Sequence, residues 1–268
     1  MTMPRRRFRD LLALGRPAVG TWTQIAAAET IDILGAAGLD FTIIDCEHGH
    51  FGLETAENLI RACDAAGLAP LVRVPPNAPQ SVSRALDAGA AAVVAPSVSS
   101  AEEMRALVSA SRFAPAGTRG SCPCVRAGDH FVRDWKAYAG SQLRELGVIA
   151  LIENRQGLER VEEICGVAGV LAVMVGPFDL SVSLGFEGDY LHPEVQSAIL
   201  RIVRAARARD LPVIAPIFDP DEKKALRQRE DWAAYGAGMF VVGTDKIFLS
   251  EAVRRYARSL GAGGGDGG

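Results

Sequence analysis

The chain has 268 residues, 49% of them hydrophobic and 23% charged, and its 29 Lys and Arg against 32 Asp and Glu leave a formal net charge of −3. This balance excludes a nucleic-acid binder that works through bulk positive charge, and the composition is far from that of disordered chains. No apolar run approaches the roughly 20 residues of a membrane-spanning helix. We therefore expect a cytoplasmic protein that binds neither membrane nor nucleic acid, with its five cysteines reduced.

Short aliphatic runs rich in β-branched residues alternate with amphipathic segments along the chain. Strands are predicted over Val19–Gln24, Phe41–Glu47, Pro70–Val74, Ala92–Ser97, Val148–Glu153, Leu171–Gly176, Pro212–Phe218 and Met239–Thr244. Helices are predicted over Glu29–Ala37, Leu53–Ala66, Pro79–Ala88, Ala101–Phe113, Arg155–Cys165, Pro193–Arg209, Pro220–Tyr235 and Lys246–Ser259. This alternation is typical of a parallel sheet with crossover helices.

Eight such units over about 250 residues predict a (β/α)₈ TIM barrel, because a doubly wound sheet has fewer strands and a glycine-rich turn after its first. No linker divides the chain, so residues 1–260 are predicted to form one barrel domain, and the Gly-rich residues 261–268 a disordered tail. The connections 97–148 and 176–212 are too long for bare crossovers. We expect both to shape a site at the carboxyl-terminal mouth of the barrel.

Polar side chains gather where the predicted strands end, and such ends meet at the mouth of a barrel. Six residues follow the second, third, fifth and sixth strands in this way: Asp45, Glu47, His48, Arg73, Glu153 and Asp179. Any one of them has an ordinary reading as the polar start of a loop. Their coincidence on otherwise aliphatic strands favours a catalytic site.

The residue types indicate what that site could do. Glu153 and Asp179 would converge as two hard oxygen ligands, which suits Mg²⁺, Mn²⁺ or Co²⁺, and the sequence offers no trio of histidines for zinc. Arg73 is suited to bind a carboxylate or to stabilise an enolate oxygen. His48 titrates near neutrality and is the natural proton carrier.

At these positions the chain resembles the HpcH/HpaI aldolases, metal-dependent enzymes that cleave 4-hydroxy-2-oxo acids to pyruvate and an aldehyde. The matching segments are GTWTQ at 20–24, IIDCEHG at 43–49, LVRVPP at 71–76, RALDAGAAAVVAP at 84–96, FAPAGTRG at 113–120, LIENRQGL at 151–158, VGPFDLS at 175–181 and HPEVQ at 192–196. The resemblance implies a barrel of the phosphoenolpyruvate/pyruvate superfamily. It also implies a homo-hexamer whose subunits exchange their last helix.

The resemblance assigns a role to each residue of the predicted site. It implies that Glu153 and Asp179 bind the metal, that His48 is the acid/base residue, that Asp87 orients this histidine, and that Arg73 stabilises the enolate. The implied reaction begins when pyruvate or hydroxypyruvate binds the metal and loses a proton. The enolate then adds to an aldehyde, and cleavage is the reverse. No organic cofactor is implied.

The remaining assignments concern the substrate. The resemblance implies that the backbone amides of Phe178 and Asp179 bind the pyruvate carboxylate, and that Asp45 and Glu47 hold metal-bound water. Leu151 replaces a glutamine of better-known members, so the acceptor side differs from theirs.

Two arginines are candidates for the acceptor pocket. A long acceptor that ends in a carboxylate is expected to be a poor substrate unless Arg119 or Arg126, in the long loop after the fourth predicted helix, reaches that carboxylate; the alternative for both arginines is a solvated loop surface.

Three alternatives stay open at this stage. Lys246, just beyond the eighth predicted strand, could serve a Schiff-base aldolase. The chain could instead be a condensing or acyl-CoA-cleaving relative, similar to siderophore citrate synthases or malyl-CoA lyases, although no segment dedicated to a larger substrate is visible. It could also be a non-catalytic binding barrel. The sequence does not identify the aldehyde, the metal or the direction of the reaction.

Overall fold

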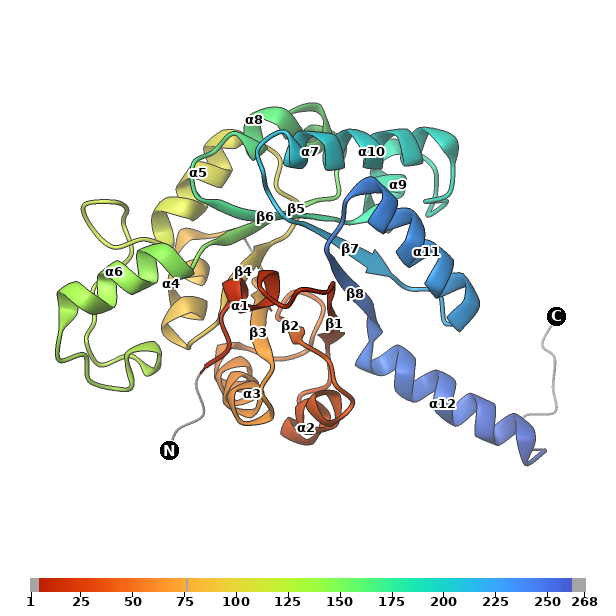
Figure 1. Cartoon of the computed structure of the whole chain (residues 1–268), viewed down its shortest axis with the longest axis horizontal. Coiled ribbons are helices and arrows are strands. Elements are labelled where there is room, and N and C mark those ends of the chain that lie inside the picture. The colour runs from red at the N-terminus through yellow and green to blue at the C-terminus, as the bar shows by residue number, and fades with distance from the viewer. Residues whose placement is uncertain (1–4, 76, 262–268) are drawn as a thin grey trace.

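Eight parallel strands close into a barrel in chain order (Figure 1), and the computed structural model describes residues 5–75 and 77–261. The strands are β1 (Ala18–Thr23), β2 (Phe41–Asp45), β3 (Ala69–Arg73), β4 (Ala92–Ala95), β5 (Val148–Ile152), β6 (Val170–Val175), β7 (Val213–Ile217) and β8 (Met239–Thr244). Each strand pairs with the next, and β8 pairs with β1. The prediction of a (β/α)₈ barrel is confirmed.

Helices surround the barrel and cover the outer faces of its strands. The helices predicted from the sequence are α2 (Ala28–Ala36), α3 (Leu53–Ala66), α4 (Pro79–Asp87), α5 (Ala101–Ala110), α7 (Arg155–Glu159), α8 (Val161–Cys165), α10 (Pro193–Arg207), α11 (Glu222–Tyr235) and α12 (Asp245–Ser259). The segment predicted as one helix over 155–165 is divided into α7 and α8 at Arg160, whose backbone leaves the helical region at φ −112° and ψ 17°. Three further helices, α1 (Phe8–Leu12), α6 (Trp135–Glu145) and α9 (Pro177–Leu184), had no sequence prediction.

The interior of the barrel is filled by alternate residues of its strands, as the period of two requires. Ile43, Leu71 and Ile149 belong to this interior cluster and are fully buried. Phe8 and Leu11 of α1 are part of the same cluster, so α1 closes the end of the barrel at which the strands begin (Figure 1). The opposite end, where the strands finish, stays open for a site.

The long connection between β4 and β5 does not lie where the sequence analysis expected it. Helix α5 runs back along the barrel, so the chain returns to the amino-terminal end before the extra residues of the loop and α6 begin. Arg5 and Arg7 near the amino terminus form ion pairs with Asp129 and Glu145 of this insertion. The expectation that residues 97–148 shape the mouth is therefore wrong. The connection 176–212 does shape it, through α9.

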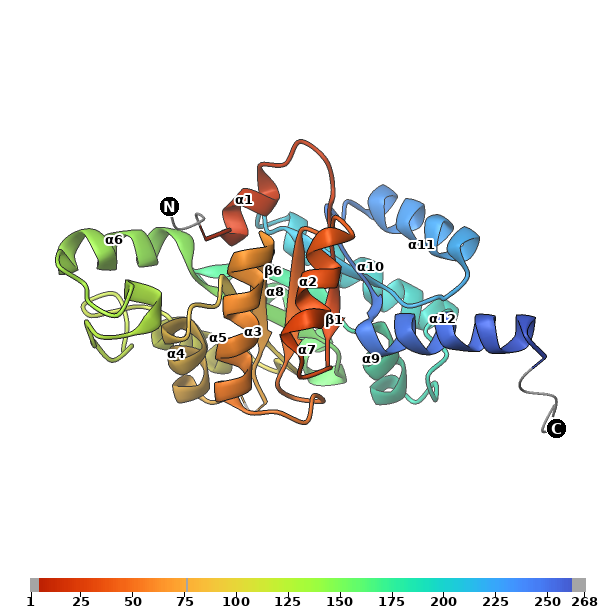
Figure 2. The ribbon, with the colours of Figure 1, turned by 90° about the horizontal axis from the view of Figure 1, so that it is seen from below.

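Helix α12 projects away from the barrel as an arm (Figures 1 and 2). Five of its large apolar side chains, or those that directly follow it, are exposed: Phe248, Leu249, Val253, Tyr256 and Leu260. The expected disordered tail lies, beyond Gly261, outside the described residues. Across residues 5–75 and 77–261, no helix is long and apolar enough to cross a membrane.

Candidate active site

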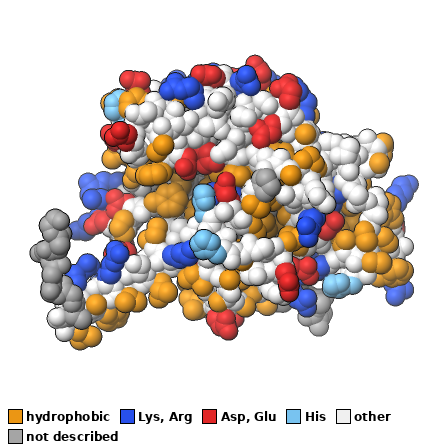
Figure 3. Space-filling model, turned by 180° about the vertical axis from the view of Figure 1, so that it is seen from behind, with side chains coloured by type: hydrophobic (Ala, Val, Ile, Leu, Met, Phe, Trp, Pro, Cys, Tyr) orange, Lys and Arg blue, Asp and Glu red, His pale blue; other side chains and the backbone are white. Residues whose placement is uncertain are grey.

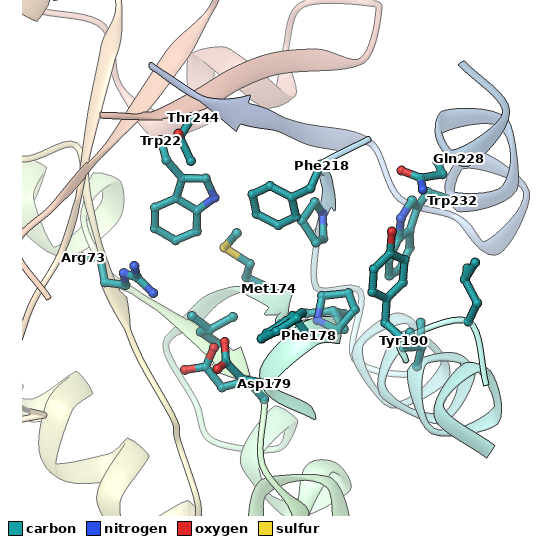
Figure 4. A pocket seen from close by; sticks show the side chains of 18 of the residues that line it. Trp22, Arg73, Met174, Phe178, Asp179, Tyr190, Phe218, Gln228, Trp232 and Thr244 are labelled. Atoms are coloured by element: carbon teal, nitrogen blue, oxygen red, sulfur yellow. The ribbon is translucent and has the colours of Figure 1, made fainter. Parts of the chain in front are cut away.

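A cavity of about 410 Å³ opens where the strands end. Its lining brings together His48 after β2, Arg73 at the end of β3, Glu153 after β5 and Asp179 in α9. Figure 4 shows Arg73 and Asp179 among the side chains around this cavity. In the space-filling view of this side, acidic and histidine side chains surround a hollow with an apolar wall (Figure 3). Four residues predicted for catalysis or metal binding thus share one cavity.

Arg73 is held in a fixed orientation by two carboxylates. Its Nε and one Nη donate hydrogen bonds to Asp45 at 2.8 and 2.6 Å, and its other Nη lies 3.0 Å from Oε2 of Glu47. The guanidinium also stacks on Trp22, with 4.3 Å from Cζ to the ring centroid. A guanidinium has five N–H donors, so two remain for a ligand in the cavity.

Asp45 is fully buried, and both of its carboxylate oxygens accept hydrogen bonds from groups of the protein. Besides Arg73, it accepts hydrogen bonds from the side chain of Gln24 at 2.8 Å and from the backbone amides of Glu47 and His48. Burial alone would raise the pKa of Asp45, but Arg73 overcomes this and holds it below its usual range. The prediction that Asp45 holds metal-bound water is not supported by this geometry, because Asp45 anchors Arg73 and the turn after β2.

Glu153 is only 6% exposed and has no ion-pair partner among the described residues. Its Oε1 accepts hydrogen bonds from the backbone amide and the hydroxyl of Ser97, at 2.7 and 3.0 Å. Burial raises the pKa of Glu153 to about 7, against the effect of these hydrogen bonds, and the nearby charge of Asp179 raises it further. A β-carbon at position 176 would lie 2.6 Å from Oε2, which explains the glycine there.

Asp179 lies in the first turn of α9, after Gly176 and Pro177. The first helical hydrogen bond runs from the amide of Leu180 to the carbonyl of Gly176, at 3.0 Å, so the amides of Phe178 and Asp179 are not used by the helix. Amides at a helix N-terminus attract anions. Their place at the cavity agrees with the predicted carboxylate site.

The chemistry of Glu153 and Asp179 fits a divalent cation. A buried carboxylate with a raised pKa, next to a second carboxylate, lacks the positive charge that would stabilise its ionised form. Hard oxygen ligands suit Mg²⁺, Mn²⁺ or Co²⁺. In the part of the chain that the structure describes, no group of three or more His, Cys, Asp or Glu side chains is arranged for a metal. The protein would thus supply these two carboxylates, leaving further positions to substrate and water.

His48 is exposed at the edge of the cavity, and Asp87 does not reach it within the chain. Asp87 is the last residue of α4, which runs opposite to the strands and so ends at the amino-terminal side of the barrel. Its carboxylate accepts hydrogen bonds from Arg119 at 2.7 and 3.1 Å. The expected pairing of Asp87 with His48 is therefore not formed in the described chain.

The two arginines predicted for an acceptor pocket also lie away from the mouth. Arg119 is buried between Asp87, Gln142 and the ring of Phe113, which lies 4.6 Å from its Cζ. Arg126 bonds to Asp64 and to the carbonyl of Ala88. Both tie the insertion after α5 to α3 and α4, so their assignment to the acceptor pocket is corrected.

The apolar part of the predicted acceptor wall is at the cavity. Leu151 is buried on β5 and faces inward, two residues before Glu153, and Phe178 lines the outer part with 57% of its surface exposed. Lys246 is not among the lining residues and is exposed, which removes support for a Schiff base there.

Two residues of the site were missed by sequence reasoning. Trp22 carries a signal, since it occupies an inward position at the end of β1. Ser97 carries none.

A closed (β/α)₈ barrel with an arginine, a histidine and two carboxylates at its mouth has the architecture of a TIM-barrel enzyme. The sequence profile of the family described as HpcH/HpaI aldolase/citrate lyase matches residues 18–246, and the chain belongs to this family. The prediction of a carbon–carbon lyase is confirmed at the level of the family.

Three similar proteins cover nearly the whole chain. A hydroxypyruvate/pyruvate aldolase of Roseovarius nubinhibens is 31% identical, over 95% of this chain and 96% of its own. A 4-hydroxy-2-oxo-heptane-1,7-dioate aldolase of Salmonella dublin is 33% identical, over 96% and 95%. The crystal structure of the citrate synthase SbnG superimposes with a TM-score of 0.82 at 27% identity, over 95% and 96%.

Proposed function

We propose that this protein is a divalent-metal-dependent class II aldolase that makes or cleaves 4-hydroxy-2-oxo acids through the enolate of pyruvate or hydroxypyruvate. The observation that supports the proposal is the cavity shared by Glu153, Asp179 and Arg73, where two carboxylates and a fixed cation surround one small space. The names of the two aldolase relatives support the same reaction.

The residues present divide the substrate between them. The carboxylate of the 2-oxo acid binds the free amides of Phe178 and Asp179 at the start of α9. The two unused N–H groups of Arg73 face the oxygen on which the enolate charge develops, and the positive guanidinium stabilises that charge. A divalent cation on Glu153 and Asp179 would polarise that oxygen as a Lewis acid and offset the buried charge of Glu153.

His48 moves the proton. An imidazole at the edge of the cavity, it takes the proton from the 4-hydroxyl during cleavage and returns one during synthesis. Asp87 is left out of the proposal because its carboxylate is bonded to Arg119. Glu47, paired with Arg73, keeps a half-buried carboxylate near Asp179, where it can hold a water molecule.

The condensing and acyl-CoA alternatives receive support from the likeness to a citrate synthase, but the cavity favours the aldolase. Arg73 and His48 are the basic side chains among the described residues that line it. A substrate with several carboxylates or a nucleotide would need further positive charge. A small 2-oxo acid and an aldehyde do not.

We further infer a homo-oligomer in which α12 is exchanged between subunits, with a hexamer as the expected assembly. The support is the arm itself, which projects from the barrel with exposed apolar side chains along its length.

The test uses pyruvate without any aldehyde, because enolisation needs only pyruvate and the metal. The protein with Mg²⁺, Mn²⁺ or Co²⁺ should exchange the methyl protons of pyruvate for deuterium in D₂O, and EDTA should stop the exchange. Absence of exchange with every divalent metal would refute the aldolase. Exchange that survives exhaustive chelation would point to an amine such as that of Lys246.

A further inference from the structure

The indole of Trp22 carries a buried donor that no group in the chain uses. Trp22 is only 5% exposed, lines the cavity, and its Nε1 has no hydrogen-bond partner. The other buried side-chain atoms without such a partner in the described residues belong to Glu47, Asp64, Asn77 and Tyr138, and none of these residues lines the cavity. An indole nitrogen can only donate, and buried donors are nearly always paired. The free N–H at this place therefore points to a ligand.

The position of the indole is fixed from two sides. One face of the ring packs under the guanidinium of Arg73, at 4.3 Å, and Arg73 is itself held by Asp45. On the other side, the pairing of β1 with β8 shifts register between Gly20 and Trp22. The hydroxyl of Thr21 donates to the carbonyl of Val242 at 2.7 Å across this irregularity. Irregular strand pairing of this kind is used to aim side chains beside active sites.

The strand order says which part of a ligand Trp22 can reach. In the closed barrel, β1 lies four strands from β5 in either direction, so Trp22 stands across the mouth from Glu153. For the 2-oxo acid that the proposed function places at Glu153 and Asp179, we take the end to which the aldehyde adds to extend across the mouth toward β1. Figure 4 shows the indole nitrogen on the side of the ring that faces the cavity and Phe218, away from Arg73.

We infer that Trp22 Nε1–H donates a hydrogen bond to a hydroxyl oxygen on the acceptor aldehyde, so that hydroxyaldehydes are preferred to alkyl aldehydes of the same size. The inference rests on the proposed function and names its acceptor class. Met174, Leu151 and Phe178 contribute apolar side chains to the same cavity, in which the indole N–H is a buried donor without a partner.

The first test compares two acceptors of matched size, glycolaldehyde and propanal, with pyruvate as donor. The parent should prefer glycolaldehyde in kcat/KM. Trp22→Phe keeps an aromatic face against Arg73 and removes the N–H, and should reduce that preference about 3- to 10-fold, as expected for one neutral hydrogen bond. Trp135→Phe, which removes an indole in α6 away from the cavity, should keep the preference of the parent.

The deuterium exchange of pyruvate separates this inference from the proposed function. If the parent exchanges pyruvate protons but shows the same preference as Trp22→Phe, the role of Trp22 is wrong and the aldolase stands. If the parent does not exchange, the aldolase itself is wrong.

A measurement on the unsubstituted Trp22 side chain tests the inference even if the Trp22→Phe variant does not fold. The chain has three tryptophans, so ¹⁵N-labelled indole groups give three signals, and that of Trp22 is identified by substitution of the other two with Phe. With Mg²⁺ and oxalate in the 2-oxo acid position, added glycolaldehyde should shift the Trp22 N–H signal and propanal should not. No shift with glycolaldehyde, or equal shifts with both, overturns the inference.

Discussion

Glu153 is a carboxylate that the fold buries without a positive partner. Ser97 satisfies one of its oxygens, yet burial raises its pKa to about 7, whereas a glutamate in an unfolded chain titrates near 4.3. Between these two pH values the metal-free folded protein holds a proton that the unfolded chain has lost. The stability of the metal-free protein should therefore fall as the pH rises through this window and level off above it.

Glu153→Gln removes the free-energy cost of burying an ionised carboxylate, because the amide carries no charge. In EDTA the variant should be more stable than the parent above pH 7, by up to about 4 kcal/mol at about 1.4 kcal/mol per pKa unit, and the difference should vanish toward pH 4. Urea unfolding between pH 4 and 8.5 measures it. Glu163→Gln, at an exposed glutamate of α8, should show no such pH dependence. Equal stability of Glu153→Gln and parent at every pH contradicts the assignment.

His48 and the two carboxylates have separable roles. Glu153→Ala or Asp179→Ala removes one of the two carboxylates that we propose as metal ligands, so Mn²⁺ affinity and pyruvate proton exchange should fall together. His48→Ala should keep Mn²⁺ affinity and lose on the order of 10²–10⁴-fold in the rate of cleavage. Titration calorimetry and steady-state kinetics measure the two quantities. His50→Ala serves as the matched control, since His50 is exposed on the same turn but does not line the cavity. A comparable loss of Mn²⁺ affinity in His48→Ala would make His48 a ligand.

The polar positions at strand ends could be predicted from the sequence because a barrel directs all its strand ends to one mouth. The hydrogen-bond partners of these residues could not be predicted from the sequence. Asp45 and Glu47 lie together at the end of one strand, but only the fold shows that both oxygens of Asp45 accept hydrogen bonds from Arg73 and that Asp45 also bonds to its own turn. Ser97 holds Glu153 from the turn after β4, 56 residues away in the sequence, with its backbone at φ 50°, and no sequence pattern marks it.

At the scale of elements, the alternation of strands and helices predicted the barrel, and the errors concern where insertions lie. An insertion that follows a strand, like α9 after β6, joins the mouth, whereas one that follows a helix, like α6 after α5, joins the opposite end. Length alone does not distinguish the two cases. Asp87 and Arg119 were predicted for the mouth and instead pair at the opposite end, where they join α4 to the insertion.

Arg119→Ala should therefore affect stability and leave acceptor choice alone. The guanidinium is fully buried, and its removal takes the donor away from the buried Gln142, whereas Asp87, with 29% of its side chain exposed, can be hydrated; we expect a loss of about 1–3 kcal/mol. Urea unfolding should show this loss, while the ratio of kcat/KM for glycolaldehyde to that for succinic semialdehyde stays at the parent value. Arg133→Ala, at an exposed arginine of the same insertion, should change neither. Altered selectivity with full stability would return Arg119 to the acceptor pocket.

At the scale of the whole molecule, the arm formed by α12 exposes an apolar face that we expect a second copy of the chain to cover. Asp245, buried at its first turn, accepts hydrogen bonds from the amides of Gln24 and Ile25, so the arm starts at a fixed place beside β1. Leu249, Val253 and Tyr256 follow at intervals of four and three residues and share one face of the helix. An apolar stripe of this kind is typical of a surface covered by another protein chain.

A charge on this stripe should dissociate the assembly. Val253→Glu introduces a carboxylate in the middle of the exposed apolar face, where covering it by a second subunit would bury an unpaired charge. Sedimentation velocity should show a smaller species than the parent, and thermal unfolding of the variant should become less dependent on protein concentration. Arg258→Glu, whose spacing places it on the opposite side of α12, should keep the size of the parent. A parent that sediments as a monomer, or a Val253→Glu variant that retains the parent's size, would show that the arm is not an interface between copies of this chain.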